Sequence, residues 1–107
     1  MATAYKKLGA ADLSATTNTT IYTVPSSKMS IVNCNVTNRS ASAVTFRIAV
    51  AESGTPGNED YYQYDTSLAG GESFQRTGIF MDTTKVLVAY GSSGDISVVA
   101  DGIEVDT

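Results

Sequence analysis

The chain of 107 residues contains no histidine, no tryptophan and a single cysteine. Most general acid–base chemistry uses imidazole, and most zinc sites need histidine or several thiolates. We therefore expect a protein without enzymatic activity, metal or other cofactor. The lone Cys34 cannot form a disulfide within the chain, so the fold must depend on its hydrophobic core.

Positive charge and long apolar runs are also scarce. Lys and Arg number 7 against 11 Asp and Glu, giving a net charge of −4, so no basic field exists to neutralise a phosphate backbone. No run approaches the roughly 18 apolar residues of a membrane span, and residues 1–9 lack the apolar segment of a signal peptide. We expect a chain made soluble in a cytoplasm, with neither nucleic acid nor membrane as a partner.

The abundant residues favour β-structure. The sequence has 14 Thr, 12 Ser and 10 Val against 4 Leu and 4 Glu, and branched side chains suit a pleated surface. With 17% charged and 42% hydrophobic residues, the chain should fold rather than stay disordered. Its length suits one domain over residues 1–107.

Alternation with a period of two predicts the strands. It is clearest at 43–51, where four apolar residues share one face: Val44, Phe46, Ile48 and Val50. Upstream, Val32, Cys34 and Val36 alternate with polar residues, which turns Cys34 inward. The turn-forming residues 38–42 predict a hairpin between these two runs.

Further strands are predicted at 4–8, 19–24, 61–68, 72–77, 85–90 and 96–105. Residues 91–95 predict a second hairpin connection. In the last strand Ile96 and Val98 have one parity and Ile103 and Val105 the other, which predicts a β-bulge at Asp101-Gly102. About eight strands without helical periodicity predict an all-β, antiparallel, jelly-roll-like β-sandwich.

Few residues suggest a chemical site. Cys34 has no histidine to activate it, and core packing is the simpler interpretation. Seven acidic or amide residues lie in or beside turns, where calcium ligands occur, but they match no calcium-loop spacing and suit turns in their own right. They are Asn58, Glu59, Asp60, Asp65, Asp82, Asp95 and Asp101.

Two segments suggest contact surfaces instead. Tyr61, Tyr62 and Tyr64 lie among acidic residues, and exposed tyrosine supplies rigid contact area with a polar tip. Simple alternation predicts that Tyr62 and Tyr64 share a face. The segment 1–18, which includes Tyr5, Lys6 and Lys7, could form an edge strand and an arm that docks on a neighbour, or a frayed terminus.

Short motifs in a fixed order resemble a family of small virion structural proteins of tailed bacteriophages. They are Tyr5-Lys6-Lys7-Leu8-Gly9 ("Y-K-x-L-G"), Thr20-Ile21-Tyr22-Thr23-Val24-Pro25, Asn35-Val36-Thr37-Asn38-Arg39-Ser40, Thr45-Phe46-Arg47-Ile48-Ala49-Val50 and the ending Asp101-Gly102-Ile103-Glu104-Val105. The resemblance implies a β-sandwich component of an assembled virion, without enzymatic activity and present in many copies. It implies no catalytic residues.

The residues and the resemblance together predict a protein that forms homo-oligomers and decorates or cements a capsid, neck or tail by binding another virion structural protein. Tyr5, Lys6, Lys7, Tyr61, Tyr62 and Tyr64 are the predicted interface residues. One alternative is a carbohydrate-binding module on the virion surface that uses the three clustered tyrosines as stacking platforms. A second is a small glycosidase, which would need a facing carboxylate pair that the sequence does not suggest.

Overall fold

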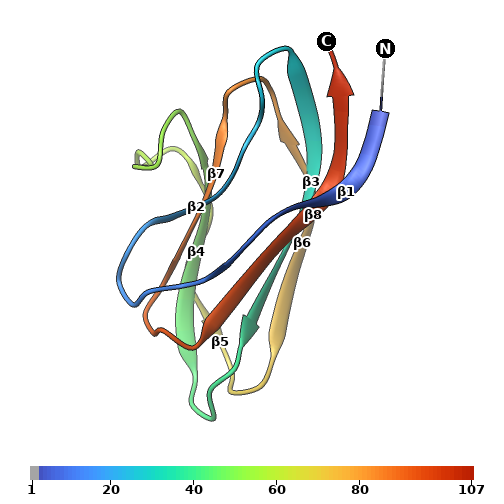
Figure 1. The fold of residues 1–107 in the computed structure, drawn as a ribbon. Helices are drawn as coiled ribbons and strands as arrows, with labels where there is room; N and C mark the ends of the chain where they lie inside the picture. The colour runs from blue at the N-terminus through green and yellow to red at the C-terminus, as the bar shows by residue number, and fades with distance from the viewer. Residues whose placement is uncertain (1–2) are drawn as a thin grey trace.

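The computed structural model describes residues 3–107, which form eight strands. They are β1 (Thr3–Asp12), β2 (Thr19–Thr23), β3 (Lys28–Asn38), β4 (Val44–Ala51), β5 (Tyr61–Leu68), β6 (Ser73–Met81), β7 (Val86–Gly91) and β8 (Ile96–Asp106). Figure 1 shows two layers of strands facing each other, with the start of β1 and the end of β8 on the same side of the molecule. The predicted all-β antiparallel sandwich is confirmed.

The two sheets have four strands each. Sheet A has the order β1-β8-β3-β6, and sheet B has the order β2-β7-β4-β5. All of the pairings are antiparallel. Of the consecutive strands only β4 and β5 are neighbours in one sheet, and every other connection crosses between sheets, which is the arrangement of a double-sheet jelly roll.

Both predicted hairpins are therefore wrong. Residues 38–42 lead from β3 in sheet A to β4 in sheet B, and residues 91–95 lead from β7 in sheet B to β8 in sheet A. Turn-forming residues occur in both kinds of connection. Facing sheets lie about 10 Å apart, a distance that five residues span without strain, so the local sequence does not distinguish the two.

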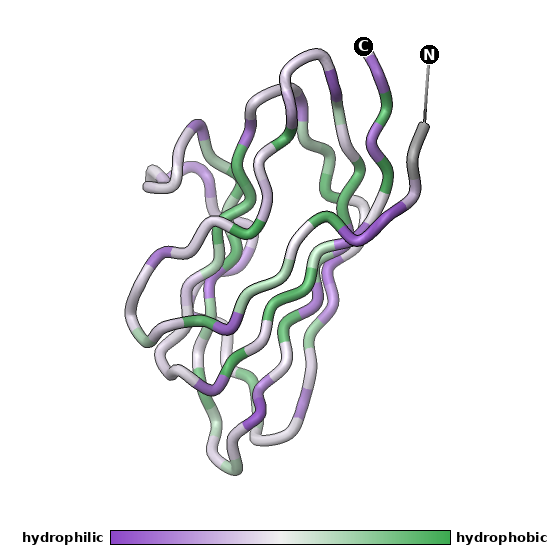
Figure 2. The backbone as a smooth tube through the Cα atoms, viewed as in Figure 1, coloured by the Kyte–Doolittle hydropathy of each residue, from purple (hydrophilic) through white to green (hydrophobic). Residues whose placement is uncertain are grey.

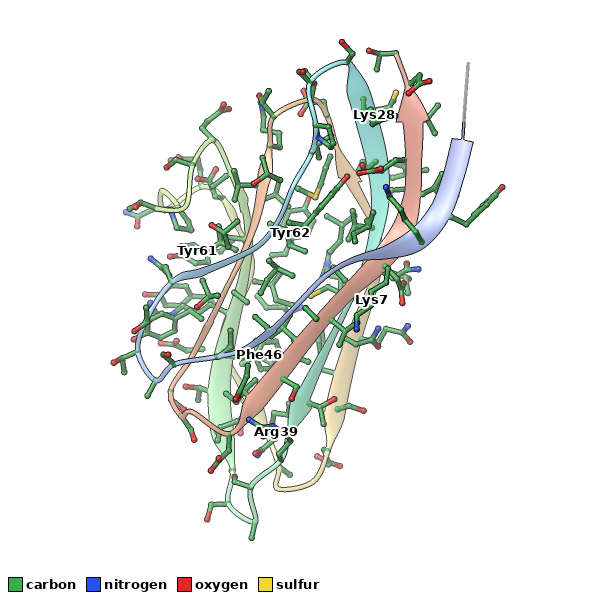
Figure 3. All side chains as sticks on the ribbon, in the orientation of Figure 1. Lys7, Lys28, Arg39, Phe46, Tyr61 and Tyr62 are labelled. Carbon is green, nitrogen blue, oxygen red and sulfur yellow. The ribbon has the colours of Figure 1, made fainter. Side chains whose placement is uncertain are left out.

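The inward faces of the sheets form one hydrophobic core. Val44, Phe46 and Ile48 of β4 are buried, as the alternation predicts, while Val50 is only partly buried against the core. The Cys34 side chain has no exposed surface. Phe46 packs against Phe74 of β6 with ring centroids 5.1 Å apart. Figure 3 shows Phe46 between the two sheets, and Figure 2 shows hydrophobic residues gathered along the strands. Burial of this apolar surface is the main stabilising term of the fold.

The predicted bulge at Asp101-Gly102 is also wrong. The β3–β8 ladder runs from Lys28↔Asp106 to Asn38↔Ile96 without a register shift. The irregularity next to these residues lies in β1, between Lys7 and Gly9. The parity change in β8 has another origin: Ile96, Val98 and Ala100 face inward, whereas Ile103 and Val105 at the end of the strand face outward.

The N-terminal segment forms an edge strand and then packs onto its own chain. After β1, Leu13 is buried in the core, and its backbone N–H donates to the Ile96 carbonyl at 2.9 Å. The Thr16 N–H donates to the Gly91 carbonyl at 2.8 Å. Residues 1–2 lie outside the described part of the chain, and docking of segment 1–18 on a neighbour stays a prediction.

Candidate interaction surface

The outer face of sheet A carries a row of apolar side chains that crosses all four strands. Tyr5 on β1 is the register partner of Ile103 on β8, Ile103 is the partner of Ile31 on β3, and Ile31 is the partner of Phe80 on β6. Register partners project from the same face and contact one another. The two ends of the row protrude most, with Tyr5 78% exposed and Phe80 74% exposed.

A second pair of apolar residues widens this row toward the end of the sheet where β1 begins and β8 ends. Met29 of β3 is the partner of Val105 of β8, and Met29 is 49% exposed. A hollow of about 320 Å³ opens beside Phe80, between the ends of β3 and β6. Its lining residues are Met29, Ser30, Ile31, Phe80, Met81 and Asp82. We call Tyr5, Met29, Ile31, Phe80, Ile103 and Val105 the apolar row.

Most of the rest of this face is polar, apart from Ala10 and Val99, which are register partners on β1 and β8. Lys7 is the register partner of Asp101, and Asp101 is the partner of Asn33, whose side-chain Nδ2 donates to the Asp101 carboxylate at 3.3 Å. Figure 3 shows Lys7 on this outer side of sheet A. Further along, Asn35 of β3 pairs with Gln75 of β6. An apolar centre with a polar margin is the usual composition of a protein–protein contact surface.

Sequence reasoning found Tyr5 but missed the other five residues of the apolar row. Their signal was present in β8, where Ile103 and Val105 have the opposite parity to Ile96 and Val98. This change of parity predicts a bulge from the sequence alone, but outward-facing apolar residues explain it. Met29 and Ile31 give the same signal in β3, because their parity is opposite to that of buried Val32 and Cys34.

Lys6, although predicted as an interface residue, reaches back toward the space between the sheets. Its Nζ lies 2.8 Å from Oε1 of Glu104, whose side chain is only 4% exposed. The Tyr22 hydroxyl donates to the other Glu104 oxygen at 2.5 Å and lies 2.7 Å from the Ser30 hydroxyl. We call Lys6, Tyr22, Ser30 and Glu104 the buried polar cluster; it joins both sheets.

The ionisation of this cluster follows from its contacts. The hydrogen bond from Lys6, then that from Tyr22, holds the pKa of Glu104 below its usual value. Burial, together with the neighbouring Glu104, raises the pKa of Tyr22 to about 12. At neutral pH the cluster therefore holds a charged Glu104 carboxylate and a neutral Tyr22 phenol.

The three clustered tyrosines lie on β5 but do not share one face. Tyr61 and Tyr64 contact each other edge to face, with ring centroids 4.8 Å apart, while the Tyr62 ring lies 4.9 Å from the Arg76 guanidinium of β6 in the other sheet. The prediction that Tyr62 and Tyr64 share a face is wrong. Two register irregularities between β4 and β5 give β5 extra residues and break its alternation.

On the outer face of sheet B, Arg47 of β4 organises a second aromatic group. Its guanidinium lies 4.2 Å from the ring centroids of both Tyr64 and Tyr90 and pairs with Asp65 at 2.6 Å. The hydrogen bond from Arg47 also holds the pKa of Asp65 below its usual value. The Arg47 guanidinium thus covers one face of each of these two rings through cation–π contacts within the chain.

Three of the other candidate residues, Cys34, Asp60 and Asp82, have structural roles. Burial raises the pKa of Cys34 to about 12, so its thiol stays protonated and unreactive. The Asp60 carboxylate accepts a hydrogen bond from the Gly57 N–H at 2.7 Å, and the Asp82 carboxylate lies 3.7 Å from the Lys85 ammonium. Within residues 3–107 no three His, Cys, Asp or Glu side chains are grouped as metal ligands would be. The same residues include no helix long and apolar enough to cross a membrane.

No known family model, curated protein or solved structure matches this chain. Inferences about its function therefore depend on the geometry of its own residues and on the order of its motifs.

Proposed function

We propose that this chain is a non-enzymatic structural protein of a tailed-bacteriophage virion, where it self-associates and decorates or cements the capsid, neck or tail. The observation that carries the proposal is the apolar row on the outer face of sheet A. It brings four of the large exposed hydrophobic side chains onto one face: Tyr5, Met29, Ile31 and Phe80.

Solvent exposure of such a surface is costly. Transfer of apolar area from water contributes about 25 cal/mol per Å², so exposed aromatic rings represent free energy that binding can recover. Soluble monomers rarely expose a continuous apolar patch of more than a few hundred Å² unless it is a binding site. A contact protein is therefore the function that this surface supports best.

The motif order supports the bacteriophage assignment, and the structure gives these motif residues a physical role. Residues 5–9 supply Tyr5 to the apolar row and Lys6 to the buried polar cluster. Residues 101–105 supply Ile103 and Val105 to the row and Glu104 to the cluster. The two most distant motifs are neighbours in the β1–β8 ladder, so both shape the same surface.

The proposed virion role can be tested on purified bacteriophage particles. Virions induced from a bacterium that carries this gene are purified by density gradient and analysed by quantitative mass spectrometry. We expect the chain to copurify at many copies per particle and to be found in the host cytoplasm before assembly. Its absence from intact, purified virions would refute the virion role.

Carbohydrate binding through the tyrosines stays a separate proposal, and jelly-roll sandwiches do occur in lectins. Its difficulty is that Arg47 and Arg76 already lie over the rings of Tyr64 and Tyr62. A glycan array probed with the wild-type chain and Tyr62→Ala separates the two functions: sugar binding lost in the variant would favour the carbohydrate module.

A further inference from the structure

We infer that the apolar row is a self-association surface, on which a second copy of this chain packs face to face about a two-fold axis parallel to the strands. This inference rests on the proposed function and names the first partner of its contact surface. Four features of the surface favour a second copy as the partner: the order of the residues in the row, the position of the hollow, the distribution of charge and the exposed apolar area.

The row has nearly the same profile in both directions. Across the sheet it reads Tyr5, Ile103, Ile31 and Phe80, with an aromatic ring at each end and an isoleucine at each inner position. A two-fold axis parallel to the strands, between β8 and β3, brings Tyr5 of one copy opposite Phe80 of the other. It also brings Ile103 opposite Ile31. A two-fold interface requires such self-complementarity.

The shape of the surface favours the same arrangement. Tyr5, the most exposed large apolar side chain, stands at the β1 end of the row, whereas the hollow lies beside Phe80 at the β6 end. Reversal of the row sets the protruding Tyr5 of each copy over the hollow of its partner. Met29 of one copy also meets Val105 of the other, so these two apolar side chains leave water together.

A two-fold axis along the row itself fits less well. It would exchange the two sides of the row and set Met29 and Val105 over the polar side that carries Asn33 and Asp101. The parallel axis instead sets Asp101 of one copy opposite Asn33 of the other. In this arrangement no carboxylate of the face lies opposite the same carboxylate of the partner. This avoids repulsion between like charges in a chain with a net charge of −4.

The area agrees with what a stable dimer needs. A standard interface buries about 800 Å² per partner, and roughly 57% of this area, or about 450 Å², is non-polar. An aromatic side chain presents about 150–250 Å², so Tyr5 and Phe80, 78% and 74% exposed, together expose about 300 Å². The four smaller members raise the total toward about 450 Å².

The first test is the oligomeric state of the full chain. Light scattering after size exclusion, from about 1 to 500 μM, should show a dimer that dissociates on dilution, as expected for an interface of standard size. Phe80→Ser and Tyr5→Ser should each weaken dimerisation about a hundredfold, because every substitution occurs twice in the interface. The matched control is Tyr64→Ser, which removes an exposed aromatic ring from the opposite face and should leave dimerisation unchanged.

The second test reads the register of the dimer. Tyr5→Cys and Phe80→Cys proteins are mixed and treated with a short bismaleimide; buried Cys34 does not interfere. We expect cross-linking between the two variants and little within either one. Cross-linking of Tyr5→Cys to itself would overturn the parallel axis in favour of the axis along the row.

The other outcomes separate this inference from the proposed function. A chain that stays monomeric to 500 μM, yet binds purified virions through Phe80, would overturn self-association and leave the virion role intact. A dimer of the expected register in a chain absent from virions would support the interface and refute the virion role. Equal loss of dimer in Phe80→Ser and Tyr64→Ser would place the contact elsewhere and overturn the inference.

Discussion

The buried polar cluster gives the sharpest test of how this sandwich is held together. Tyr22→Phe removes only the hydroxyl that donates to Glu104 at 2.5 Å and lies 2.7 Å from Ser30, and it leaves the ring in place. Glu104 is 4% exposed, so water cannot easily replace the lost donor. A hydrogen bond to a charged group contributes about 1.5–3 kcal/mol, and we expect a loss of about 2 kcal/mol.

This loss of unfolding free energy lowers the melting temperature by an amount that can be calculated. For a chain of this size 1 kcal/mol corresponds to roughly 4 °C, so Tyr22→Phe should melt about 8 °C below the wild type at pH 7. Circular dichroism measures the difference. Tyr64→Phe, which removes the same atom from an exposed ring, should change the melting temperature by less than about 2 °C.

The pH dependence of this difference has a defined sign. The folded-state pKa of Glu104 is lowered, so its stabilising contribution is present above the unfolded value of about 4.3 and is lost as the pH falls through the folded value. The pKa of Tyr22 is raised to about 12, so its contribution is present below the unfolded value of 10.0 and is lost as the pH rises toward 12. The gap between wild type and Tyr22→Phe should narrow below about pH 4 and above about pH 10. A shift under about 2 °C at pH 7, or an equal gap at pH 3 and pH 7, would refute this account.

Three further predictions concern other parts of the fold. Asn38→Ala removes the amide that donates to backbone carbonyls of two connections between the sheets, and urea unfolding should show a loss of about 2–3 kcal/mol; a loss under about 1 kcal/mol would contradict this role. Gly102→Ala should cost more than about 2 kcal/mol, because its φ is +151° and a Cβ there would lie 2.1 Å from the Ile31 carbonyl oxygen, whereas Gly94→Ala should be near neutral; equal effects would contradict the clash. The Cys34 thiol should react with a thiol reagent only on unfolding, because burial raises its pKa to about 12, and rapid labelling of the native protein would show that it is accessible.

The strands were predictable because a period of two is a local property. Inward Val44, Phe46 and Ile48 alternate with outward residues, and all eight predicted strands occur at or near their expected ranges. The pairing of the strands was not predictable in this way. Tyr5 and Ile103 are register partners across nearly the whole chain, and no short segment encodes that contact. A connection between sheets uses the same turn residues as a hairpin, so residues 38–42 carried no information on which sheet follows.

The candidate interaction surface was likewise not predictable from local sequence. An exposed tyrosine near the N-terminus is visible in the sequence, but the apolar row exists only because three long-range pairings align Tyr5, Ile103, Ile31 and Phe80. In β5 the prediction that Tyr62 and Tyr64 share a face failed for a local reason, because bulges shift the alternation without a clear sequence signal. Tyr61 therefore joined Tyr64, while Tyr62 turned toward Arg76.

The edge strand β1 explains why one short motif affects both the surface and the interior. Its alternation points Tyr5 outward into the apolar row and turns Lys6 back to Glu104, while Lys7 faces outward beside Asp101. An edge strand pairs with one neighbour only. The Lys6–Glu104 ion pair adds a side-chain contact to the β1–β8 ladder, and Glu104 in turn accepts a hydrogen bond from Tyr22 of the other sheet. Since Tyr5 directly precedes Lys6, this contact also helps to hold the backbone from which the Tyr5 ring projects. The position of the contact surface thus depends on a charge pair at the buried side of the same strand.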